Sequence, residues 1–220
     1  MAGRLIVIEG IDGSGKSTQV DKLRMRLERE GKSFRYQKFP RYDNPSSQLL
    51  RMYLGGEFGT DPDAVNPYAS SAFFAVDRAA AFLQGLNDYY NNGGIILCDR
   101  FTTSNAVHQA AKLPPEKQIP FADWLFDFEY CKLGLPKPDA VFFLDISPEL
   151  SAGLIKKRGQ GEDIQEADVG FLARSADAAR RIASHYGWIS IGCERDGKLR
   201  PPEDIAGEIY DKVRLLFQQG

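Results

Sequence analysis

The stretch GIDGSGKS at residues 10–17 constrains the fold of this chain more than any other feature. It matches the pattern G-x-x-x-x-G-K-[ST] in full and directly follows the apolar run LIVI at residues 5–8. After it, apolar residues recur at helical spacing from Val20 to Leu27, and Gly31 then marks a natural helix end. A strand, a glycine-rich loop and a helix in this order predict a parallel α/β sheet, with the loop at the carboxyl end of its first strand.

A loop of this kind binds phosphate because its glycines let successive backbone N–H groups point inward, where the following helix adds its positive dipole end. In this motif the ammonium of Lys16 reaches the β- and γ-phosphates, and the hydroxyl of Ser17 ligates magnesium. The alternative, a glycine-rich turn with an incidental lysine, fits the strand–loop–helix context poorly. The predicted ATP-binding residues are Gly10, Ile11, Asp12, Gly13, Ser14, Gly15, Lys16, Ser17 and Thr18.

Short apolar runs alternate with helical patterns along the rest of the chain. The runs lie at residues 33–38, 95–98, 140–144 and 188–193. This alternation predicts one doubly wound domain over residues 1–220, a phosphate-loop (P-loop) NTPase fold with five parallel strands and helices on both faces.

Two stretches of the chain look irregular, residues 40–67 and residues 158–168. The second is polar and contains two glycines, so we expect a short lid at about residues 157–168. An ordinary surface loop is the alternative.

Composition narrows the possible partners and the location. The net charge of −2 shows no basic excess, so we expect no nucleic-acid polymer as partner. The three cysteines are far apart, which argues against a disulfide framework or a zinc site, and Cys98 and Cys193 are expected in buried strands. No stretch reaches about 18 apolar residues, and the N-terminal apolar run is too short for a signal peptide. We therefore expect no membrane association and a cytoplasmic location.

Three further stretches supply candidates for a second binding site. The first, Phe39-Pro40-Arg41, follows the predicted second strand. The second is FFAVDR, in which Phe74 and Arg78 are four residues apart and share a helical face. A ring that stacks on a base and a guanidinium that hydrogen-bonds to its edge would suit a nucleotide. The alternative is a core phenylalanine and an arginine paired with a surface carboxylate.

The third stretch, ILCDRFTTSNAVHQ, begins as a buried strand that ends at Asp99 and Arg100. Ligands of open α/β sheets bind at such carboxyl ends. Asp99 could support the magnesium site through water, and Arg100 could clamp a phosphate; a structural ion pair between them is the alternative. The polar residues that follow share one helical face: Ser104, Asn105, His108 and Gln109. For His108 a purely structural role is the alternative.

The class of phosphate-loop protein follows from what the chain lacks. No Asn-Lys pair occurs, so the guanine-reading N-K-x-D of a GTPase is missing, and the chain is too short for most ATP-driven motors. A small kinase remains, and this class requires a second, phosphorylated substrate opposite the first. A kinase of another nucleotide or deoxynucleoside and a non-catalytic nucleotide-sensing module stay as alternatives.

From residue 5 to about residue 213 the chain resembles the thymidylate kinase family. The matching pieces, in order, are GIDGSGKSTQ, FP, FFAVDR, CDRFTTSNAVHQ, LGLPKPDAVFFLDI and DIQEADVGFL. The resemblance implies ATP- and Mg²⁺-dependent phosphorylation of thymidine 5′-monophosphate to the diphosphate, in a homodimer.

The resemblance also implies roles for individual residues. Asp12 would face the sugar 3′-hydroxyl and help organise magnesium, and Phe74 would stack on thymine. Arg78 and Asn105 would read the base edge at O4 and N3, whereas Arg100 would hold the substrate phosphate.

Around the sugar, the resemblance implies that His108 occupies a place where many members have an aromatic residue that crowds the ribose 2′ position. Gln109 would belong to the same wall. The Phe39-Pro40 peptide bond is often cis in relatives.

Two positions depart from the family pattern. Some members carry a catalytic arginine at the position of Gly13, and members without it usually place basic residues in the lid. Here Lys156, Lys157 and Arg158 open the expected lid; any of the three could replace the missing arginine, and Arg158 is the one we include among the predicted catalytic residues. The alternative for this basic run is a helix C-terminus, which favours cations. The arginine after Phe39-Pro40 is Arg41, next to the place where some relatives have theirs.

Overall fold

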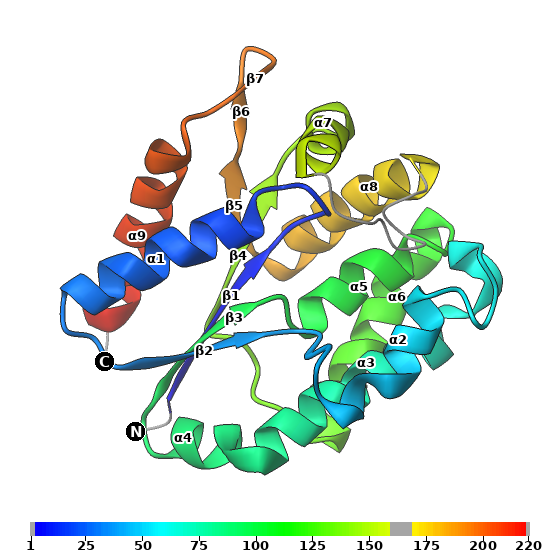
Figure 1. The fold of residues 1–220 in the computed structure, drawn as a ribbon, viewed down its shortest axis with the longest axis horizontal. Coiled ribbons are helices and arrows are strands. Elements are labelled where there is room, and N and C mark those ends of the chain that lie inside the picture. Colours follow the sequence, from blue (N-terminus) through cyan, green and yellow to red (C-terminus); the bar gives the residue numbers. More distant parts are fainter. Residues whose placement is uncertain (1–2, 159–168, 219–220) are drawn as a thin grey trace.

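Five parallel strands in the order β2-β3-β1-β4-β5 form the central sheet of the chain (Figure 1). The computed structural model describes residues 3–158 and 169–218. The strands are β1 (Arg4–Glu9), β2 (Phe34–Lys38), β3 (Ile95–Asp99), β4 (Ala140–Asp145) and β5 (Ile189–Gly192). This sheet confirms the predicted α/β fold with a parallel sheet.

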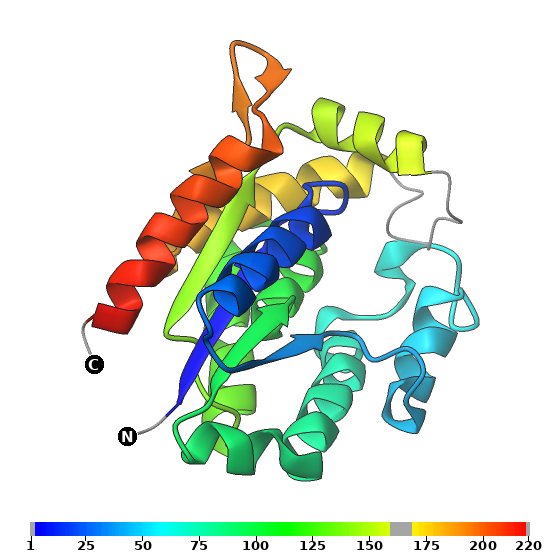
Figure 2. The ribbon, with the colours of Figure 1, turned by 60° about the vertical axis from the view of Figure 1, so that its left-hand side comes forward.

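Helices cover both faces of the sheet, which explains why β1, β3 and β4 are nearly continuous apolar runs. Ile6 and Ile8 pack on the face covered by α1 and α9, whereas Leu5 and Val7 pack with Phe82 on the other face. Figures 1 and 2 show α1 and α9 side by side, with α5, α6 and α8 grouped on the opposite side. The α-helices are α1 (Lys16–Arg29), α2 (Gln48–Leu54), α3 (Pro67–Ala81), α4 (Asn87–Asn91), α5 (Thr102–Ala110), α6 (Pro115–Phe126), α7 (Pro148–Arg158), α8 (Val169–Tyr186) and α9 (Pro202–Gln218).

Shorter helical segments connect these elements. Two are 3₁₀ turns, η1 (Pro45–Ser47) and η2 (Pro62–Ala64), and two are π-helical, η3 (Phe82–Leu86) and η4 (Asp127–Lys132). The segment η4 continues α6 directly and ends it in a widened turn, whereas η3 contains Gly85 with a non-helical φ of 118° and marks a kink between α3 and α4.

Two parts of the fold differ from the expectation. The stretch 40–67 is not irregular throughout, because it contains η1, α2 and η2. After β5, a hairpin of β6 (Glu194–Arg195) and β7 (Lys198–Leu199) extends beyond the sheet, at the top of Figure 2, and buried Cys193 lies just before it rather than within a strand. The predicted lid falls on residues 159–168, outside the described residues, apart from the end of α7.

All three cysteines are free thiols, and Cys98 and Cys193 are buried. Within residues 3–158 and 169–218, no helix combines the length and the apolar character that a membrane span requires.

Candidate active site

A cavity of about 1030 Å³ lies at the carboxyl end of the sheet, where β1, β2, β3 and β5 lead into loops or helices. Most of the residues predicted for the two sites line this one cavity. They are Asp12, Gly13, Ser14, Gly15, Lys16, Ser17, Thr18, Phe39, Pro40, Phe74, Arg78, Asp99, Arg100, Ser104, Asn105, His108 and Gln109. The folded chain thus brings the phosphate loop and the second set of residues into one common space.

The phosphate loop curls around the ammonium group of Lys16. Gly13 and Gly15 adopt φ angles of 73° and 86°, which side chains rarely allow. Lys16 Nζ donates to the carbonyl oxygens of Gly10 and Ile11 at 2.8 and 2.7 Å. Burial, helped by the positive charge of Arg100, lowers the pKa of Lys16 to about 8. The cation is therefore held ready at the point where the motif places phosphates, in surroundings that disfavour its charge until an anion binds.

The two predicted magnesium-site residues meet at the carboxyl end of the sheet. Ser17, at the start of α1, donates a hydrogen bond of 3.3 Å to Asp99 Oδ2 at the end of β3. A hydroxyl and a carboxylate are ligand types that Mg²⁺ prefers. Among the described residues, no three or more His, Cys, Asp or Glu side chains form a group that could hold a metal. A cation bound here would therefore need ligands from a nucleotide or from water, which is usual for Mg²⁺.

Arg100 occupies the centre of the cavity wall, with a left-handed φ of 68°. Its guanidinium pairs with Asp12, and Nη1 contacts Ser104 Oγ at 3.2 Å and His108 Nε2 at 3.0 Å. Burial opposes the charge of Arg100, but the nearby carboxylates outweigh burial and hold its pKa above the ordinary value. The ion pair is thus formed with Asp12 of the phosphate loop, not with the sequence neighbour Asp99.

His108 is neutral in this environment, since burial lowers its pKa to about 3. A neutral imidazole that faces the donor Nη1 of Arg100 accepts through Nε2, which puts its proton on Nδ1. The ring also stacks on Phe171 of α8, with centroids 6.4 Å apart. His108 therefore connects the Arg100 side of the cavity to the helix that follows the predicted lid.

Arg78 and Phe74 of α3 form the second wall, as their four-residue spacing predicts. Arg78 is only 2% exposed and pairs through Nε and Nη2 with Glu129 of η4, at 2.6 and 2.5 Å. Glu129 is fully buried and also accepts a hydrogen bond of 2.8 Å from Thr102. Arg78 thus pairs with a carboxylate, as the alternative expected, but with a buried one and not with one at the surface. This two-point contact fixes the guanidinium plane against the cavity. Phe74 packs edge-on against Tyr53, at 6.3 Å and 86°.

The amides of α5 are also oriented by α3. Asn105 Nδ2 donates to the carbonyl oxygen of Ser71 at 3.1 Å, and Gln109 Oε1 accepts from Ser70 Oγ at 2.6 Å. For Asn105, this contact uses the donor end of the side chain on the protein. Its oxygen is the atom available to accept a proton from a ligand.

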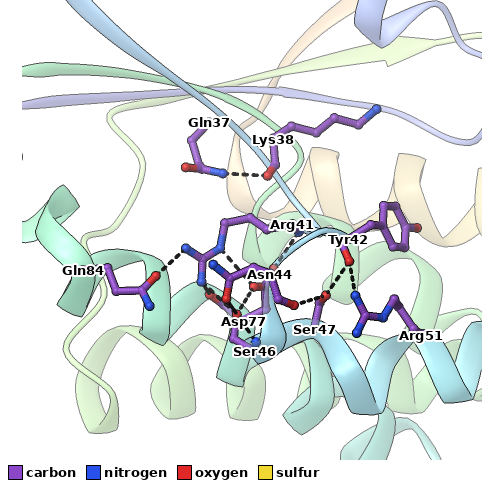
Figure 3. A network of polar contacts seen from close by, with 10 residues as sticks. All are labelled: Gln37, Lys38, Arg41, Tyr42, Asn44, Ser46, Ser47, Arg51, Asp77 and Gln84. Atoms are coloured by element: carbon purple, nitrogen blue, oxygen red, sulfur yellow. Dashed lines mark hydrogen bonds and ion pairs between the residues drawn. The ribbon is translucent and has the colours of Figure 1, made fainter.

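Arg41, also a predicted substrate residue, is not among the residues that line the cavity. It belongs instead to a network of polar contacts (Figure 3). Its guanidinium binds Asp77 Oδ1 at 3.0 Å and reaches Ser46 and Gln84 at 2.8 Å each, and its backbone N–H binds Asp77 Oδ2 at 2.8 Å. Asp77 is 1% exposed, and its charge is compensated by this arginine. Arg41 thus fastens the loop after β2 to α3, and its contact with the substrate stays a prediction. The Phe39-Pro40 peptide bond before it is cis, in agreement with the resemblance.

Several cavity residues were not predicted. Near the second site they include Lys38, Tyr42, Arg51 and Leu54, and near the phosphate loop they include Gln19, Leu154, Leu199, Arg200, Pro202 and Ile205. Arg51 lies on α2, within the stretch taken as irregular, and it donates to the carbonyl oxygen of Tyr42 (Figure 3). The signal that could have found it is the spacing of buried Leu50, Tyr53 and Leu54 around it.

Gly13, where some relatives have an arginine, lies directly under α7. A Cβ atom at this position would be 2.5 Å from the carbonyl oxygen of Ser151 and 2.8 Å from Ile155 Cγ1. Ser151 also donates through its hydroxyl to the carbonyl oxygen of Asp12. The beginning of α7 therefore packs on the phosphate loop, and its basic end carries Lys156. The side chain of Arg158 lies outside the described residues, so its catalytic role stays a prediction.

The fold and the cavity together define a phosphate-loop nucleotide-binding protein with room for a second ligand. The Thymidylate kinase family profile matches residues 8–196, and the chain belongs to this family. Thymidylate kinase of Mycobacterium tuberculosis (strain ATCC 25618 / H37Rv) is 34% identical over 215 residues, which cover 90% of this chain and 98% of its own length. Thymidylate kinase of Caenorhabditis elegans is 33% identical over 220 residues, which cover 96% of this chain and 91% of its own length.

Proposed function

We propose that this chain transfers a phosphoryl group from ATP to thymidine 5′-monophosphate, giving thymidine diphosphate and ADP, a step in dTTP synthesis. The observation that carries this proposal is the shared cavity, in which the phosphate loop lies together with Phe74, Arg78 and Asn105. The family membership and the relatives named thymidylate kinase support the same reaction.

In the acceptor site, Phe74 stacks on the thymine ring and Arg78, held rigid by Glu129, donates to O4. The oxygen of Asn105 accepts a hydrogen bond from the N3–H group. Arg100 then holds the substrate phosphate, while Asp12 turns to the sugar 3′-hydroxyl. These roles rest on the family resemblance and are supported by the fixed orientations of Arg78 and Asn105.

The transfer itself needs positioning and charge neutralisation more than a general base. The acceptor phosphate is largely dianionic near neutral pH, so it attacks in line without losing a proton first. Lys16 and Arg100 stabilise charge on the transferred group, and Arg158 adds a cation from the lid. Closure of the lid excludes water, which otherwise competes as the acceptor.

A magnesium ion fits the oxygen pair of Ser17 and Asp99, where it would neutralise negative charge on the ATP phosphates.

A homodimer is part of the same proposal, and α3 offers a surface for it. Val76 and Leu83 are 52% and 81% exposed, large values for apolar side chains on a helix and its continuation. A cytoplasmic location is supported by three cysteines that are all free.

A coupled assay of ADP release over a panel of nucleoside monophosphates tests this function directly. We expect turnover with thymidylate above that with any other acceptor. A different preferred monophosphate or deoxynucleoside would make the chain a kinase of another substrate. Binding without turnover would favour a nucleotide-sensing module. Lys16→Ala serves as the control, because loss of a preorganised cation should lower kcat by about a hundredfold or more.

A further inference from the structure

The buried carboxylate of Glu9 has no place in the reaction described above, although it lies beside the phosphate loop. Glu9 ends β1, is 0% exposed, and is not among the residues that line the cavity. Its Oε1 accepts from the backbone N–H of Gly10 at 2.9 Å, and Oε2 accepts from Thr103 Oγ1 at 2.7 Å. Burying a carboxylate is costly unless donors surround it, so this position calls for a physical reason.

The position of Arg100 explains the buried carboxylate, because Ile8 and Glu9 of β1 contact the backbone and the guanidinium of Arg100, respectively. Its backbone N–H donates to the carbonyl oxygen of Ile8 at 3.3 Å, and its Nη1 lies 4.0 Å from Glu9 Oε1. Arg100 keeps a left-handed φ of 68°, a conformation that costs a non-glycine residue energy and persists only when surroundings enforce it. The end of β1 is that enforcing neighbour.

A single hydroxyl links the two charges more closely. Ser104 Oγ lies 2.9 Å from both oxygens of Glu9 and 3.2 Å from Arg100 Nη1. A carboxylate only accepts and a guanidinium only donates, so the Ser104 proton points to Glu9 and a lone pair points to Arg100. Glu9 therefore sets the direction of this hydroxyl, and through it the place of the guanidinium.

We propose that Glu9 is a positioning residue that holds Arg100 in place for the substrate phosphate when Asp12 releases it. The inference rests on the proposed function, in which Asp12 turns to the sugar. Asp12 and Arg100 have side chains that are 16% and 17% exposed, so a ligand can reach their ion pair. Glu9 is reached by neither ligand nor solvent, and its attraction for Arg100 is little screened. It is the partner that stays constant through the catalytic cycle.

Glu9→Gln tests this, because the amide keeps the shape and its oxygen can still accept from Gly10, while the charge is lost. The amide nitrogen would then face Ser104 and reverse the direction of its hydroxyl. We expect kcat/KM for thymidylate to fall about ten- to a hundredfold, as small misplacements of binding groups do, with KM for ATP almost unchanged. The matched control is Thr103→Val, which removes one hydrogen bond to Glu9 but keeps the carboxylate, and should change neither constant more than about twofold.

A double-mutant cycle with Arg100→Ala separates positioning from mere structure. If Glu9 acts through Arg100, Glu9→Gln has no further effect on thymidylate Kd or kcat/KM once Arg100 is gone. The inference is overturned if Glu9→Gln lowers kcat/KM equally with and without Arg100, or if it changes neither Kd nor kcat/KM in the otherwise wild-type protein. Should Glu9→Gln fail to fold by circular dichroism, Glu9→Asp with Arg100→Ala forms the same cycle, because the shorter side chain keeps the charge but draws the carboxylate away from Ser104 and Arg100. Because Kd is measured as well, binding without turnover would refute the proposed function and still decide the role of Glu9.

Discussion

Placing an arginine at Gly13 would restore the residue that some relatives carry in the phosphate loop, and we expect it to harm this protein. The backbone φ of 73° costs a side chain about 1–2 kcal/mol. The new Cβ would also lie 2.5 Å from the Ser151 carbonyl oxygen and 2.8 Å from Ile155 Cγ1, and overpacking of this kind costs about 1–3 kcal/mol. The free energy of unfolding should therefore fall by about 2–5 kcal/mol.

For a chain of this length, that loss corresponds to a Tm lower by roughly 4–20 °C, measurable by thermal unfolding with and without ATP. Gly13→Ala is the matched control, since it has the same backbone and Cβ contacts but no charge, and it should show most of the loss. Turnover of Gly13→Arg should not exceed that of the wild type, because α7 occupies the space above the loop. A Gly13→Arg variant with unchanged Tm and higher kcat would refute this reasoning.

Four further predictions concern single groups. Because Lys16 must be protonated to bind phosphates and its pKa is about 8, kcat/KM for ATP should fall about tenfold per pH unit above pH 8. A pH profile that stays flat to pH 10 would contradict this. Arg78→Ala should narrow the preference for thymidylate over deoxycytidylate, of about 10⁴-fold for a site of this kind, chiefly by lowering kcat/KM for thymidylate. Equal use of both substrates by the wild type would refute the base-reading role. Arg158→Ala should lower kcat and leave thymidylate affinity nearly intact, the pattern of an interaction made in the transition state; an unchanged kcat would make this residue a helix terminus only. Val76→Glu should convert a dimer into monomers in light scattering with little change in Tm, and a wild-type monomer would remove the α3 interface.

The parts of the fold that the sequence predicts are those where one physical signal dominates. β1, β3 and β4 are buried between two helical layers, so their residues form unbroken apolar runs that stand out. By contrast, α2 buries only Leu50, Tyr53 and Leu54, a pattern shorter than two turns between a proline and two glycines. The hairpin β6–β7 has strands of two residues, too short for any periodicity.

In the site, too, the sequence predicts only the residues that a local signal along the chain defines. The phosphate loop and the polar face of α5 could be predicted because spacing along the chain fixes them. Which buried carboxylate each arginine contacts could not, because Arg78 and Glu129 are 51 residues apart and Arg41 and Asp77 are 36 apart. From charge alone, Arg41 and Arg51 are equally good candidates to bind a phosphate. Only the three-dimensional fold shows that Arg41 forms an ion pair with Asp77.

Helix α5 has a consequence for how substrate preference could change. All nine of its residues are buried, so the same short element forms both a wall of the cavity and part of the interior. Ala106 and Ala110 pack with Phe121 of α6, whereas Asn105 and His108 line the cavity. A random library over α5 would therefore lose most members to misfolding before selectivity is tested. Redesign has a wider choice at Phe74 and Arg51, which lie on the cavity wall outside this helix and are only partly buried.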